Sequence, residues 1–574
     1  MEEVKTVKGK RYFDGAWLEK KNGIYLLHLK GDNCQMAYQH GRLMKDEIRD
    51  GFLHILHRYI KQLIFHTRLG RLWPARLLAL KYIHAKFYSP IIKKIPPEYR
   101  DEVYALADGA GLPRRMILET CVISDVLLNS LAMLYHNRMQ YRRHSALGCT
   151  SFVAANRATV DGELIHGRNL DFDGMGYWDK YPTVVFCQPE EGMWYVMFTT
   201  AGFHSAGNTG INESGIVLNT HINLSADTST RGTPIWIIGE KVIRKARSIK
   251  DAIETLKKFR PTVGWTFVIS DAKKKDAVSV ELSAKNMSVR RMDGGILWNS
   301  NNYISEELKE GELCINRSTS LNFEARYRRM KDLLEQNYGK IDIPKAIEFL
   351  GDHWDIYTNR TRATGDVIAQ FNNLMSMIIS SNEHKFWIAN GPAPACNSTY
   401  VGFDILHEMT PVKDEKPLSL YKDKKFYGTR NYQGLRKYIE AEGAYFWDND
   451  CGKAYKLLSE AIALDLNEPF YLQTKGLLCL KLGKFEEAKE VLNRALGLPQ
   501  NDHKIATNHL WLGRSYDLLK ERNKALDEYR QTLQNNDLDH RIRESAEMGL
   551  LKAYSSRKAA RIEIDFYSGE PIEY

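Results

Sequence analysis

The chain carries a cysteine followed, within a short span, by a cation, an amide and a carboxylate. These residues lie in LGCTSFVAANRATVDGELIHGRNLDF, residues 147–172. A β-branched run after Cys149, an Asp-Gly turn and a second apolar run predict a two-stranded hairpin. The second strand ends in Arg168, Asn169 and Asp171, so the hairpin would return these side chains to the cysteine.

Nucleophilic catalysis by the thiol is the chemistry that such a group could perform. The thiolate is the reactive form of cysteine, and a nearby guanidinium such as that of Arg168 lowers the pKa of a thiol. A single cysteine in a chain of 574 residues is, however, more often a small buried hydrophobic residue than a nucleophile. On this hairpin alone, catalysis and structural packing are both open.

The hairpin and the segments around it resemble the isopenicillin N acyltransferase (penicillin acyltransferase) family of N-terminal-nucleophile cysteine amide hydrolases. Bile salt hydrolases and acid ceramidases are relatives with the same Cys … Arg-x-x-Asp order. The resemblance extends from about residue 25 to 405, and its further segments are YQHG at 38–41, YRDE at 99–102, ADGAG at 107–111, GINESG at 210–215, NNY at 301–303, the arginine helix around Arg326 and FWIANGPAP at 386–394. Ser300 and Asn302 depart from the family's Thr-Asn-His-Tyr element.

This resemblance implies a precursor that its own nucleophile cleaves between Gly148 and Cys149. Glycine before the nucleophile imposes little steric bulk and tolerates a strained backbone. Cleavage would free the α-amine of Cys149, and the ordinary α-amine pKa of about 7.7–8.0 suits a base that accepts the thiol proton. An acyl-thioester would follow, and the acyl group would pass to water or to another amine.

Five supporting residues receive roles from the same resemblance. Arg168 would stabilise the thiolate or the substrate carbonyl, while Asp171 would orient Arg168 and hold the α-ammonium or the leaving amine. Asn219 and Asn301 would donate hydrogen bonds to the tetrahedral oxyanion. Arg326 would close the polar network from the other side.

Structural roles stay open for three of these residues: capping of turns or strand ends for Asn219 and Asn301, and a surface helix position for Arg326. The run NSNN makes the assignment ambiguous, so Asn299 and Asn302 are rivals for the role of Asn301. The implied mechanism needs no cofactor and no metal. It also needs none of the histidines that flank the motifs, which are His144, His166, His204 and His221.

The predicted fold class is α+β: an αββα sandwich of the N-terminal-nucleophile hydrolase type, followed by an all-α tetratricopeptide-repeat domain. Strand-like runs predict two antiparallel sheets, and helical stretches near 233–258 and 321–350 would cover their outer faces. The strand-like runs are 182–200, 265–271, 277–284, 375–381 and 385–390. The predicted domains are a helical pro-segment at 1–148, a catalytic domain at 149–406, a Lys-rich linker at 407–434 and helical repeats at 435–574.

Small residues in the C-terminal part recur at tetratricopeptide spacing. Steps from Gly443 to Gly476 and from Gly476 to Gly513 bracket the expected period of about 34 residues. Small residues at these places let paired helices approach closely, and stacked pairs bury a continuous core. We therefore expect three repeats and a closing helix, which would bind a protein partner, mediate self-association or pack on the enzyme.

Composition describes a soluble globular chain, with 43% hydrophobic and 26% charged residues. No run has the length of an uncharged membrane span, and the N-terminus lacks the layout of a signal peptide. The eight cysteines are scattered without a C-x-x-C pair, which argues against a disulfide framework or a zinc site. These features predict a cytoplasmic protein in a reducing compartment.

Part of the net charge of +10 is concentrated in residues 52–97, which contain nine Lys or Arg and no Asp or Glu. Apolar residues interleave at helical spacing. One interpretation is a pair of amphipathic helices packed on the catalytic domain with a solvated basic face. The other is peripheral contact with anionic lipid, or guidance of a fatty-acyl substrate. No nucleic acid is expected, because no binding motif accompanies the charge.

Two functions of different classes follow. The first is a self-cleaving amide hydrolase or N-acyltransferase that acts through Cys149 on a small-molecule linear N-acyl amide, with a fatty-acyl chain as one candidate. The second is a catalytically inactive αββα scaffold whose repeats mediate protein–protein interaction. The intact Cys149, Arg168 and Asp171 set favours the enzyme, since a scaffold need not retain it.

Overall fold

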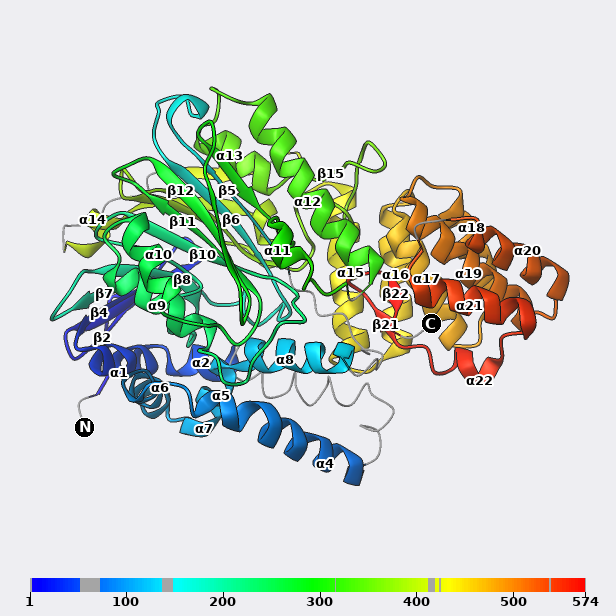
Figure 1. The fold of residues 1–574 in the computed structure, drawn as a ribbon, viewed down its shortest axis with the longest axis horizontal. Coiled ribbons are helices and arrows are strands. Elements are labelled where there is room, and N and C mark those ends of the chain that lie inside the picture. Colours follow the sequence, from blue (N-terminus) through cyan, green and yellow to red (C-terminus); the bar gives the residue numbers. More distant parts are fainter. Residues whose placement is uncertain are drawn as a thin grey trace.

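A computed structural model describes residues 3–51, 73–136, 148–314, 316–410, 419–422, 425–535 and 538–572. It has a mixed α+β architecture with two large sheets, helices packed on both of them, and a helical region at the C-terminal end (Figure 1).

The larger sheet has eleven strands, and most of its neighbours are antiparallel. In spatial order they are β1 (Lys5–Val7), β2 (Lys10–Phe13), β3 (Ala16–Lys21), β4 (Ile24–Gly31), β7 (Pro182–Pro189), β8 (Tyr195–Thr200), β9 (Thr209–Asn212), β10 (Ile216–Ile222), β11 (Trp265–Asp271), β12 (Asp276–Leu282) and β13 (Met287–Arg291). The exception is β4, which pairs with β7 in parallel.

The N-terminal segment therefore supplies four strands to this sheet, and the prediction of a helical segment over 1–148 was wrong for its first part. The strands are joined by the two-residue turns Lys8-Gly9, Asp14-Gly15 and Asn22-Gly23, in which every residue has a positive φ. Such X-Gly pairs are signals for tight hairpins, and the prediction did not use them.

The smaller sheet has seven strands, all antiparallel to their neighbours. They are, in spatial order, β14 (Ile296–Asn299), β5 (Gly148–Ala154), β6 (Ile165–Asp171), β17 (Asn373–Ser380), β18 (Lys385–Ala389), β19 (Thr399–Asp404) and β20 (Leu420–Lys422). The predicted hairpin is confirmed as β5 and β6. Because β20 pairs with β19, part of the predicted linker 407–434 belongs to this sheet.

The two sheets bury apolar side chains against each other. Phe186 and Phe198 of the larger sheet meet Phe386 of the smaller sheet, with ring centroids 6.5 and 5.0 Å apart. Helices cover the other face of each sheet. On the larger sheet these are α1 (Asn33–Leu43), α6 (Pro97–Ala110), α9 (Ile235–Lys245) and α10 (Ile249–Lys257), and on the smaller sheet α12 (Arg317–Gln336) and α13 (Ile343–Leu350).

Helices α1 and α6 cross at two glycines from the motifs singled out in the sequence. A Cβ atom on Gly41 would lie 2.4 Å from the Leu106 carbonyl oxygen, and one on Gly109 would lie 2.4 Å from the Tyr38 carbonyl oxygen. Any larger residue would push the helices apart. These motifs thus fix helix packing beneath the larger sheet.

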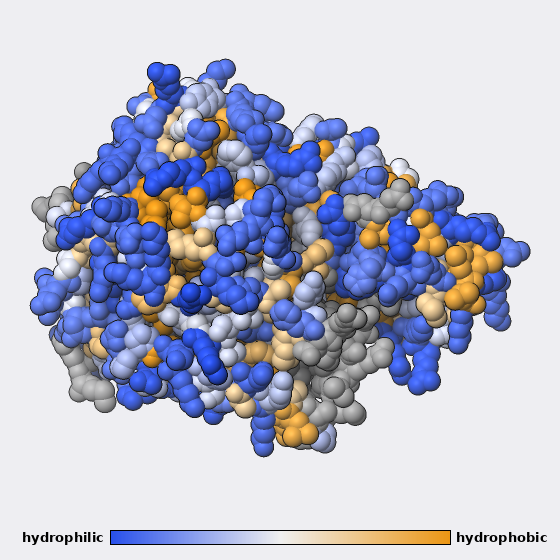
Figure 2. Space-filling model, in the orientation of Figure 1, coloured by the Kyte–Doolittle hydropathy of each residue, from blue (hydrophilic) through white to orange (hydrophobic). Residues whose placement is uncertain are grey.

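Residues 52–72 of the predicted basic stretch lie outside the described residues. The described remainder forms α4 (Trp73–Ile83), the π-helix η2 (His84–Tyr88) and α5 (Ser89–Ile92). Phe87 and Ile91 are buried, whereas Leu77, Leu78 and Tyr82 are exposed, and hydrophobic residues reach the surface over α4 (Figure 2). This segment therefore packs with one part and leaves apolar side chains uncovered in another.

Shorter elements connect these layers. They are α2 (Lys45–Asp50), α7 (Arg114–Cys121), α8 (Ile123–His136), η3 (Asn156–Ala158), α11 (Glu306–Lys309), β15 (Trp354–Asp355), β16 (Arg360–Thr361), η4 (Ala395–Asn397) and α14 (Ile405–Met409). Among the described residues, no single helix is long and apolar enough to cross a membrane. Helices α7 and α8 reach that length and composition together, but they meet at a bend of 54°.

The C-terminal region contains three antiparallel helix pairs and a closing helix. The elements are α15 (Arg430–Phe446), α16 (Cys451–Leu464), α17 (Pro469–Lys481), α18 (Phe485–Leu496), α19 (Asp502–Leu518), α20 (Arg522–Leu533), α21 (His540–Leu551), α22 (Ser556–Ala559) and the hairpin β21 (Ile564–Asp565) and β22 (Glu570–Pro571). Helices begin before the predicted boundary at 435, and the hairpin shows that the region is not entirely α-helical. Gly476 and Gly513 pack against Leu492 and Tyr529, as their spacing predicted.

Buried polar and aromatic contacts join the sheets to this region. Arg362 pairs with Asp355 and with Glu468 at the start of α17. Phe371 packs edge-on against Tyr438 of α15, with ring centroids 5.6 Å apart. The hairpin β21–β22 lies between α12 and the helical pairs (Figure 1). The C-terminal region is therefore docked on the β-sheet part.

Candidate active site

The pleat of the β5–β6 hairpin decides which side chains share a face. Cys149 pairs with Leu170, and Gly148 pairs with Asp171. Directly paired residues point to the same side of a sheet, while neighbours along a strand point to opposite sides. Cys149 therefore faces the larger sheet and Asp171 faces away from it, toward α12. The Cys149 side chain is nearly buried, at 4% exposure.

Arg168 shares the face of Cys149 and lies beside its sulfur. Arg168 Nη2 is 3.6 Å from Cys149 Sγ, and it also donates to the Thr220 carbonyl at 2.9 Å. Both guanidinium Nη atoms further contact Asn208. The predicted orientation of Arg168 by Asp171 is wrong, because positions three apart in a strand project to opposite faces.

Two residues from distant segments hold the backbone of Cys149. The Cys149 amide donates to Asn301 Oδ1 at 2.8 Å, and Arg326 Nη1 donates to the Cys149 carbonyl at 2.7 Å. Arg326 Nη2 also donates to Asn301 Oδ1 at 3.0 Å. The structure thus places Asn301 and Arg326, two of the residues predicted for the site, at the backbone of Cys149.

The ambiguity in the NSNN run is resolved by these contacts. Asn299 donates to Ser279 and Asn302 accepts from Ser300, so neither rival of Asn301 contacts the cysteine. Asn301 Nδ2 already donates to the Ile222 carbonyl at 2.8 Å. Because a side-chain amide nitrogen carries two hydrogens, this contact does not occupy Nδ2 fully, and the donation from Asn301 to an oxyanion stays a prediction.

Arg326 is fully buried, which excludes the alternative of a surface helix arginine. Its Nε donates to Asn322 one turn earlier on α12, at 3.0 Å. Its Nη1 also donates to Thr150 at 3.0 Å. The neighbouring Arg328 is an exposed helix residue. Helix α12 therefore presents one arginine to the hairpin and the other to solvent.

Asn219 is not brought to the cysteine. Its Nδ2 contacts His166 Nε2, and His166 Nδ1 contacts Ser270 at 2.9 Å. His166 pairs with Val153 on β5, four positions beyond Cys149, so this contact lies farther along the hairpin. The oxyanion role predicted for Asn219 has no support in this placement.

Two other asparagines, Asn208 and Asn223, lie on segments that line a cavity at Cys149. Asn208 lines a cavity at Cys149, and its Oδ1 accepts from Arg168 and Thr220, at 3.2 and 3.0 Å. Asn223 follows Ile222, which lines the same cavity, and Asn223 Nδ2 is buried without a hydrogen-bond partner in the described part of the chain. The sequence could not single out Asn223, because several asparagines lie near this motif. Only the tertiary structure shows that its Nδ2 is buried and unpaired among the described residues.

Burial dominates the electrostatics of the site. It raises the pKa of the Cys149 thiol, and the nearby Arg168 opposes this effect. It also raises the pKa of Asp171 to about 6, against the influence of Arg326. Asp171 Oδ1 accepts from Asn373 Nδ2 at 2.7 Å, while Oδ2 has no partner within the described residues. The thiol therefore needs a base, and Asp171 has an oxygen available for a donor.

An apolar cavity of about 80 Å³ opens at the sulfur. Besides Cys149, Arg168 and Asp171, it is lined mainly by large apolar side chains. Its apolar lining includes Ile123, Leu170, Trp178, Phe203, Trp236 and Trp265. Such a lining fits an aliphatic or aromatic group next to the thiol. Within the described residues, no cluster of three His, Cys, Asp or Glu could hold a metal ion.

Comparison with protein families finds two matches in this chain. Residues 158–393 match the family described as acyl-coenzyme A:6-aminopenicillanic acid acyl-transferase, and residues 471–502 match a tetratricopeptide repeat. The chain therefore contains a segment similar to this acyl-transferase family and a repeat of the predicted type. The first match begins after Cys149, so Cys149 lies outside it.

Relatives among curated proteins are distant. An uncharacterized protein of Archaeoglobus fulgidus is 24% identical over 357 residues, or 57% of this chain and 58% of the relative. Protein dcd1B of Dictyostelium discoideum is 22% identical over 44% of this chain and 48% of its own length. The N-acylethanolamine-hydrolyzing acid amidase of Caenorhabditis elegans is 37% identical over 86 residues, or 15% of this chain and 20% of its own. The chain thus spans about half the length of the first of these relatives.

Proposed function

We propose that the protein is a self-activating cysteine amide hydrolase or N-acyltransferase of the N-terminal-nucleophile type. The observation that carries this proposal is the environment of Cys149. Its sulfur faces Arg168 and an apolar cavity, while its backbone nitrogen is held by Asn301. The acyl-transferase family match and the acid amidase relative support the same reaction class.

Maturation would break the bond between Gly148 and Cys149. The thiol attacks the Gly148 carbonyl carbon, the C–N bond breaks, and water hydrolyses the resulting thioester. This step leaves a Gly148 carboxylate and a free α-amine on Cys149. Glycine suits this position because a Cβ atom would lie 3.2 Å from Asp171 Cβ and Oδ2, a contact that a side chain would crowd.

Turnover would repeat the same attack on an external amide. The α-amine of Cys149 accepts the thiol proton, because an α-amine has a pKa near neutrality, whereas burial raises that of the thiol. Sγ then bonds to the substrate carbonyl carbon and the amine leaves with the transferred proton. Water or a second amine attacks the thioester, releases the acyl group and restores the thiol.

The supporting residues receive revised roles in this proposal. Asn301 orients the Cys149 nitrogen, and Arg326 fixes its carbonyl. Arg168 stabilises the thiolate. The unpaired oxygen of Asp171 accepts a hydrogen bond from the α-ammonium of Cys149 or from the leaving amine. The unpaired Nδ2 of Asn223 is our candidate oxyanion donor, because a buried N–H without a partner is preorganised for developing negative charge.

We further propose that the two packed sheets and their helical layers form an αββα sandwich of the N-terminal-nucleophile type. The layers follow one another in the order helices, sheet, sheet and helices, and an apolar cluster lies between each pair of neighbouring layers. The position of Cys149 as the second residue of β5 suits this arrangement, since cleavage after Gly148 would make that strand begin with Cys149.

The substrate we propose is an N-acyl amide with a medium or long acyl chain. The apolar cavity at Cys149 provides a site for the chain, and each buried methylene contributes about 0.8 kcal/mol. The exposed Leu77, Leu78 and Tyr82 of α4 and the basic residues around them would contact anionic lipid. Binding to phosphatidylserine vesicles at low salt, lost at high salt, is the expected result; no binding at either salt concentration would contradict it.

A comparison of the wild-type protein with Cys149→Ala tests the function. We expect the wild type to yield fragments 1–148 and 149–574 on denaturing electrophoresis, and to gain the mass of one acyl group when quenched with N-dodecanoyl amides. Cys149→Ala should stay a single unacylated chain, whereas Cys479→Ala, in α17, should behave as the wild type. An uncleaved wild-type protein with full activity would refute the N-terminal-nucleophile mechanism, and absence of any acylation would favour the scaffold.

A further inference from the structure

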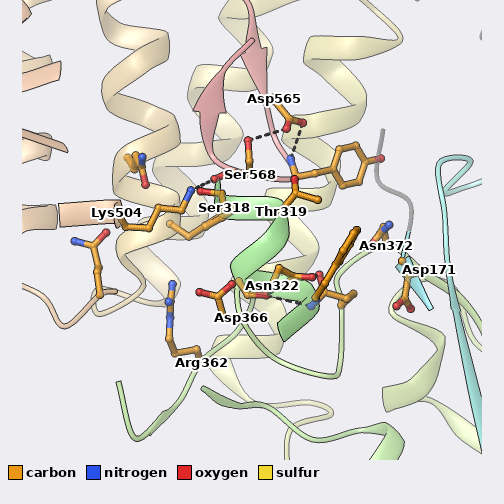
Figure 3. Close-up of a pocket in the computed structure, with 18 residues that line it drawn as sticks. Asp171, Ser318, Thr319, Asn322, Arg362, Asp366, Asn372, Lys504, Asp565 and Ser568 are labelled. Carbon is orange, nitrogen blue, oxygen red and sulfur yellow. Dashed lines mark hydrogen bonds between the residues drawn. The ribbon is translucent and has the colours of Figure 1, made fainter. Parts of the chain in front are cut away.

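A second, polar cavity lies on the opposite side of the β5–β6 hairpin from the apolar one. Its volume is about 70 Å³, and it lies between the β-sheet part and the helical region. Three parts of the chain meet there: β6 with Asp171, α12 with Ser318 and Asn322, and the C-terminal region with Lys504 (Figure 3). The proposed function gives this cavity no role.

The two cations that line the cavity are already neutralised by carboxylates. Arg362 pairs with Asp355 and Glu468, and Lys504 Nζ lies 2.6 Å from Glu570. Neither cation is therefore available to hold an anionic ligand at low cost, because a ligand would have to displace a buried ion pair.

Two carboxylates that line the cavity have no such partner. Asp366 forms no ion pair within the described part of the chain, and it accepts a hydrogen bond from Asn501 at 2.8 Å. Asp171 likewise forms no ion pair among the described residues, and its Oδ2 is unpaired. Figure 3 shows the two carboxylates at separate places on the cavity wall, with Asp366 beside Arg362. A cationic ligand could therefore meet Asp366 and Asp171 without displacing one of the ion pairs of the lining.

Gln473 is a second, independent observation that indicates a binding site for a polar ligand. It lies on α17, lines the cavity and is 0% exposed. Neither its amide oxygen nor its amide nitrogen has a hydrogen-bond partner within the described residues. A buried amide left unpaired costs free energy, so such a group is expected to meet a polar ligand.

We propose that this cavity binds the amine part of the substrate, and that this amine part carries a second, cationic nitrogen. The inference rests on the proposed function and names its substrate class as N-acyl diamines. Asp171 receives the nitrogen of the scissile amide, and the distal ammonium donates to the Asp366 carboxylate and to the unpaired amide oxygen of Gln473. The helical region thereby supplies part of the substrate site.

The position of the cavity relative to Cys149 supports this division. Gly148 and Asp171 line both cavities, so the two meet at the hairpin end that bears the nucleophile. An acyl chain in the apolar cavity places the carbonyl at Sγ, and the leaving nitrogen then points past Asp171 to the polar side. Cleavage after Gly148 would create a free chain end at the point where the two cavities meet.

Three amides whose amine parts each contain four carbons test the proposal with the mature full chain. They are N-dodecanoyl-1,4-diaminobutane, N-dodecanoyl-butylamine and N-dodecanoyl-4-aminobutyrate, which carry a positive, no and a negative charge at the distal end. We expect kcat/KM for the cationic amide to exceed that for the neutral amide by about tenfold or more, as charge-assisted hydrogen bonds imply. The anionic amide should be the poorest. Amides of 1,3-diaminopropane and 1,5-diaminopentane then measure the span that fits.

Asp366→Asn and Gln473→Leu should each lower the ratio of kcat/KM for the cationic amide over the neutral amide by about tenfold. Gln473→Leu replaces an unpaired amide with an apolar group of similar size, so it should fold at least as well as the wild type. Asp527→Asn and Gln531→Leu on the exposed face of α20 are matched controls, and neither should change the preference.

The outcomes separate this inference from the proposed function. If Cys149 is acylated by all three amides at equal rates, the polar cavity is not an amine site and the inference is wrong. If no amide acylates Cys149, the proposed function fails. Titration calorimetry with free 1,4-diaminobutane then tests separately whether the polar cavity binds a diamine. Binding by the wild type that Gln473→Leu abolishes would support the site, and no binding would overturn it.

Discussion

The two faces of one hairpin differ in almost every respect. The face of Cys149 and Arg168 points between the sheets and meets an apolar cavity rimmed by tryptophans. The face of Gly148 and Asp171 points outward and meets a polar cavity completed by the helical region. A single β-pleat would thus separate the proposed acyl site from the proposed amine site, because neighbouring residues of a strand project in opposite directions.

This contrast teaches that the helical region does more than extend the molecule. Its contacts with the β-sheet part are buried and charged, as between Arg362 and Glu468. A partner-binding module on a loose tether would need no such contacts. The cavity at the inner face of the hairpin is lined without any residue of the C-terminal region. The cavity at the outer face is complete only when the C-terminal region packs on the β-sheet part.

Removal of the inner cation should have the largest effect. Arg168→Ala takes away the hydrogen bond and the charge next to Cys149 Sγ, so kcat/KM should fall by roughly 10³. Arg168→Lys should recover part of this loss. Arg290→Ala, which removes a half-buried arginine that lines neither cavity, should leave the rate nearly unchanged. Wild-type rates in Arg168→Ala would show that the inner face is not the reacting face.

Three asparagines on the inner side can be ranked by the same assay. Asn223→Ala removes the unpaired donor and should lower kcat by about 10²–10³. Asn208→Ala should act more weakly, through the position of Arg168. Asn219→Ala should change the rate by less than about threefold, because its partner is His166 rather than the cysteine. The reverse ranking would restore the oxyanion role that the sequence suggested for Asn219.

On the outer face, Asp171→Asn should change the pH dependence of stability. The folded-state pKa of Asp171 is about 6 because of burial, above the value of 3.8 for an unperturbed carboxyl. Folded protein thus holds the proton more tightly, and the stability present below about pH 4 is lost as the pH rises through 6. The variant should be as stable as the wild type at pH 4 and more stable by about 2 kcal/mol at pH 7.5.

Calorimetric unfolding of Asp171→Asn, the wild type and the exposed control Asp527→Asn at both pH values measures this difference. Activity should fall in Asp171→Asn even though stability rises, since the ammonium acceptor is lost. An equal stability change at pH 4 and pH 7.5 would mean that the Asp171 carboxyl does not titrate as its burial implies.

The smallest expected effect concerns the size of the apolar cavity. Trp236→Ala enlarges the cavity lining, so the preferred acyl chain should lengthen by a few carbons. Each added methylene should raise kcat/KM by about fourfold until the space is filled. Trp298→Ala, on β14 and outside the lining, serves as the control. An unchanged chain-length profile in Trp236→Ala would show that the acyl chain does not bind in this cavity.

Much of the local structure follows from the sequence. Alternating apolar residues located β11, β12, β17 and β18, and the Asp-Gly turn located the β5–β6 hairpin. Glycine spacing located the helical pairs, because Gly476 and Gly513 are places where a side chain would collide with the next helix. These signals are local or periodic, so they survive without knowledge of the fold.

What the sequence determined by itself was the hairpin, its cysteine and the class of chemistry that a thiol beside an arginine could perform. Only the tertiary structure decided which asparagine of the NSNN run meets Cys149, that Asn219 lies away from it, and that Asp171 does not orient Arg168. It also decided that residues 5–31 build strands and that the C-terminal region completes a polar cavity. Contacts such as those of Arg326 span 177 residues along the chain, and no local pattern encodes which distant side chains come to share one buried site.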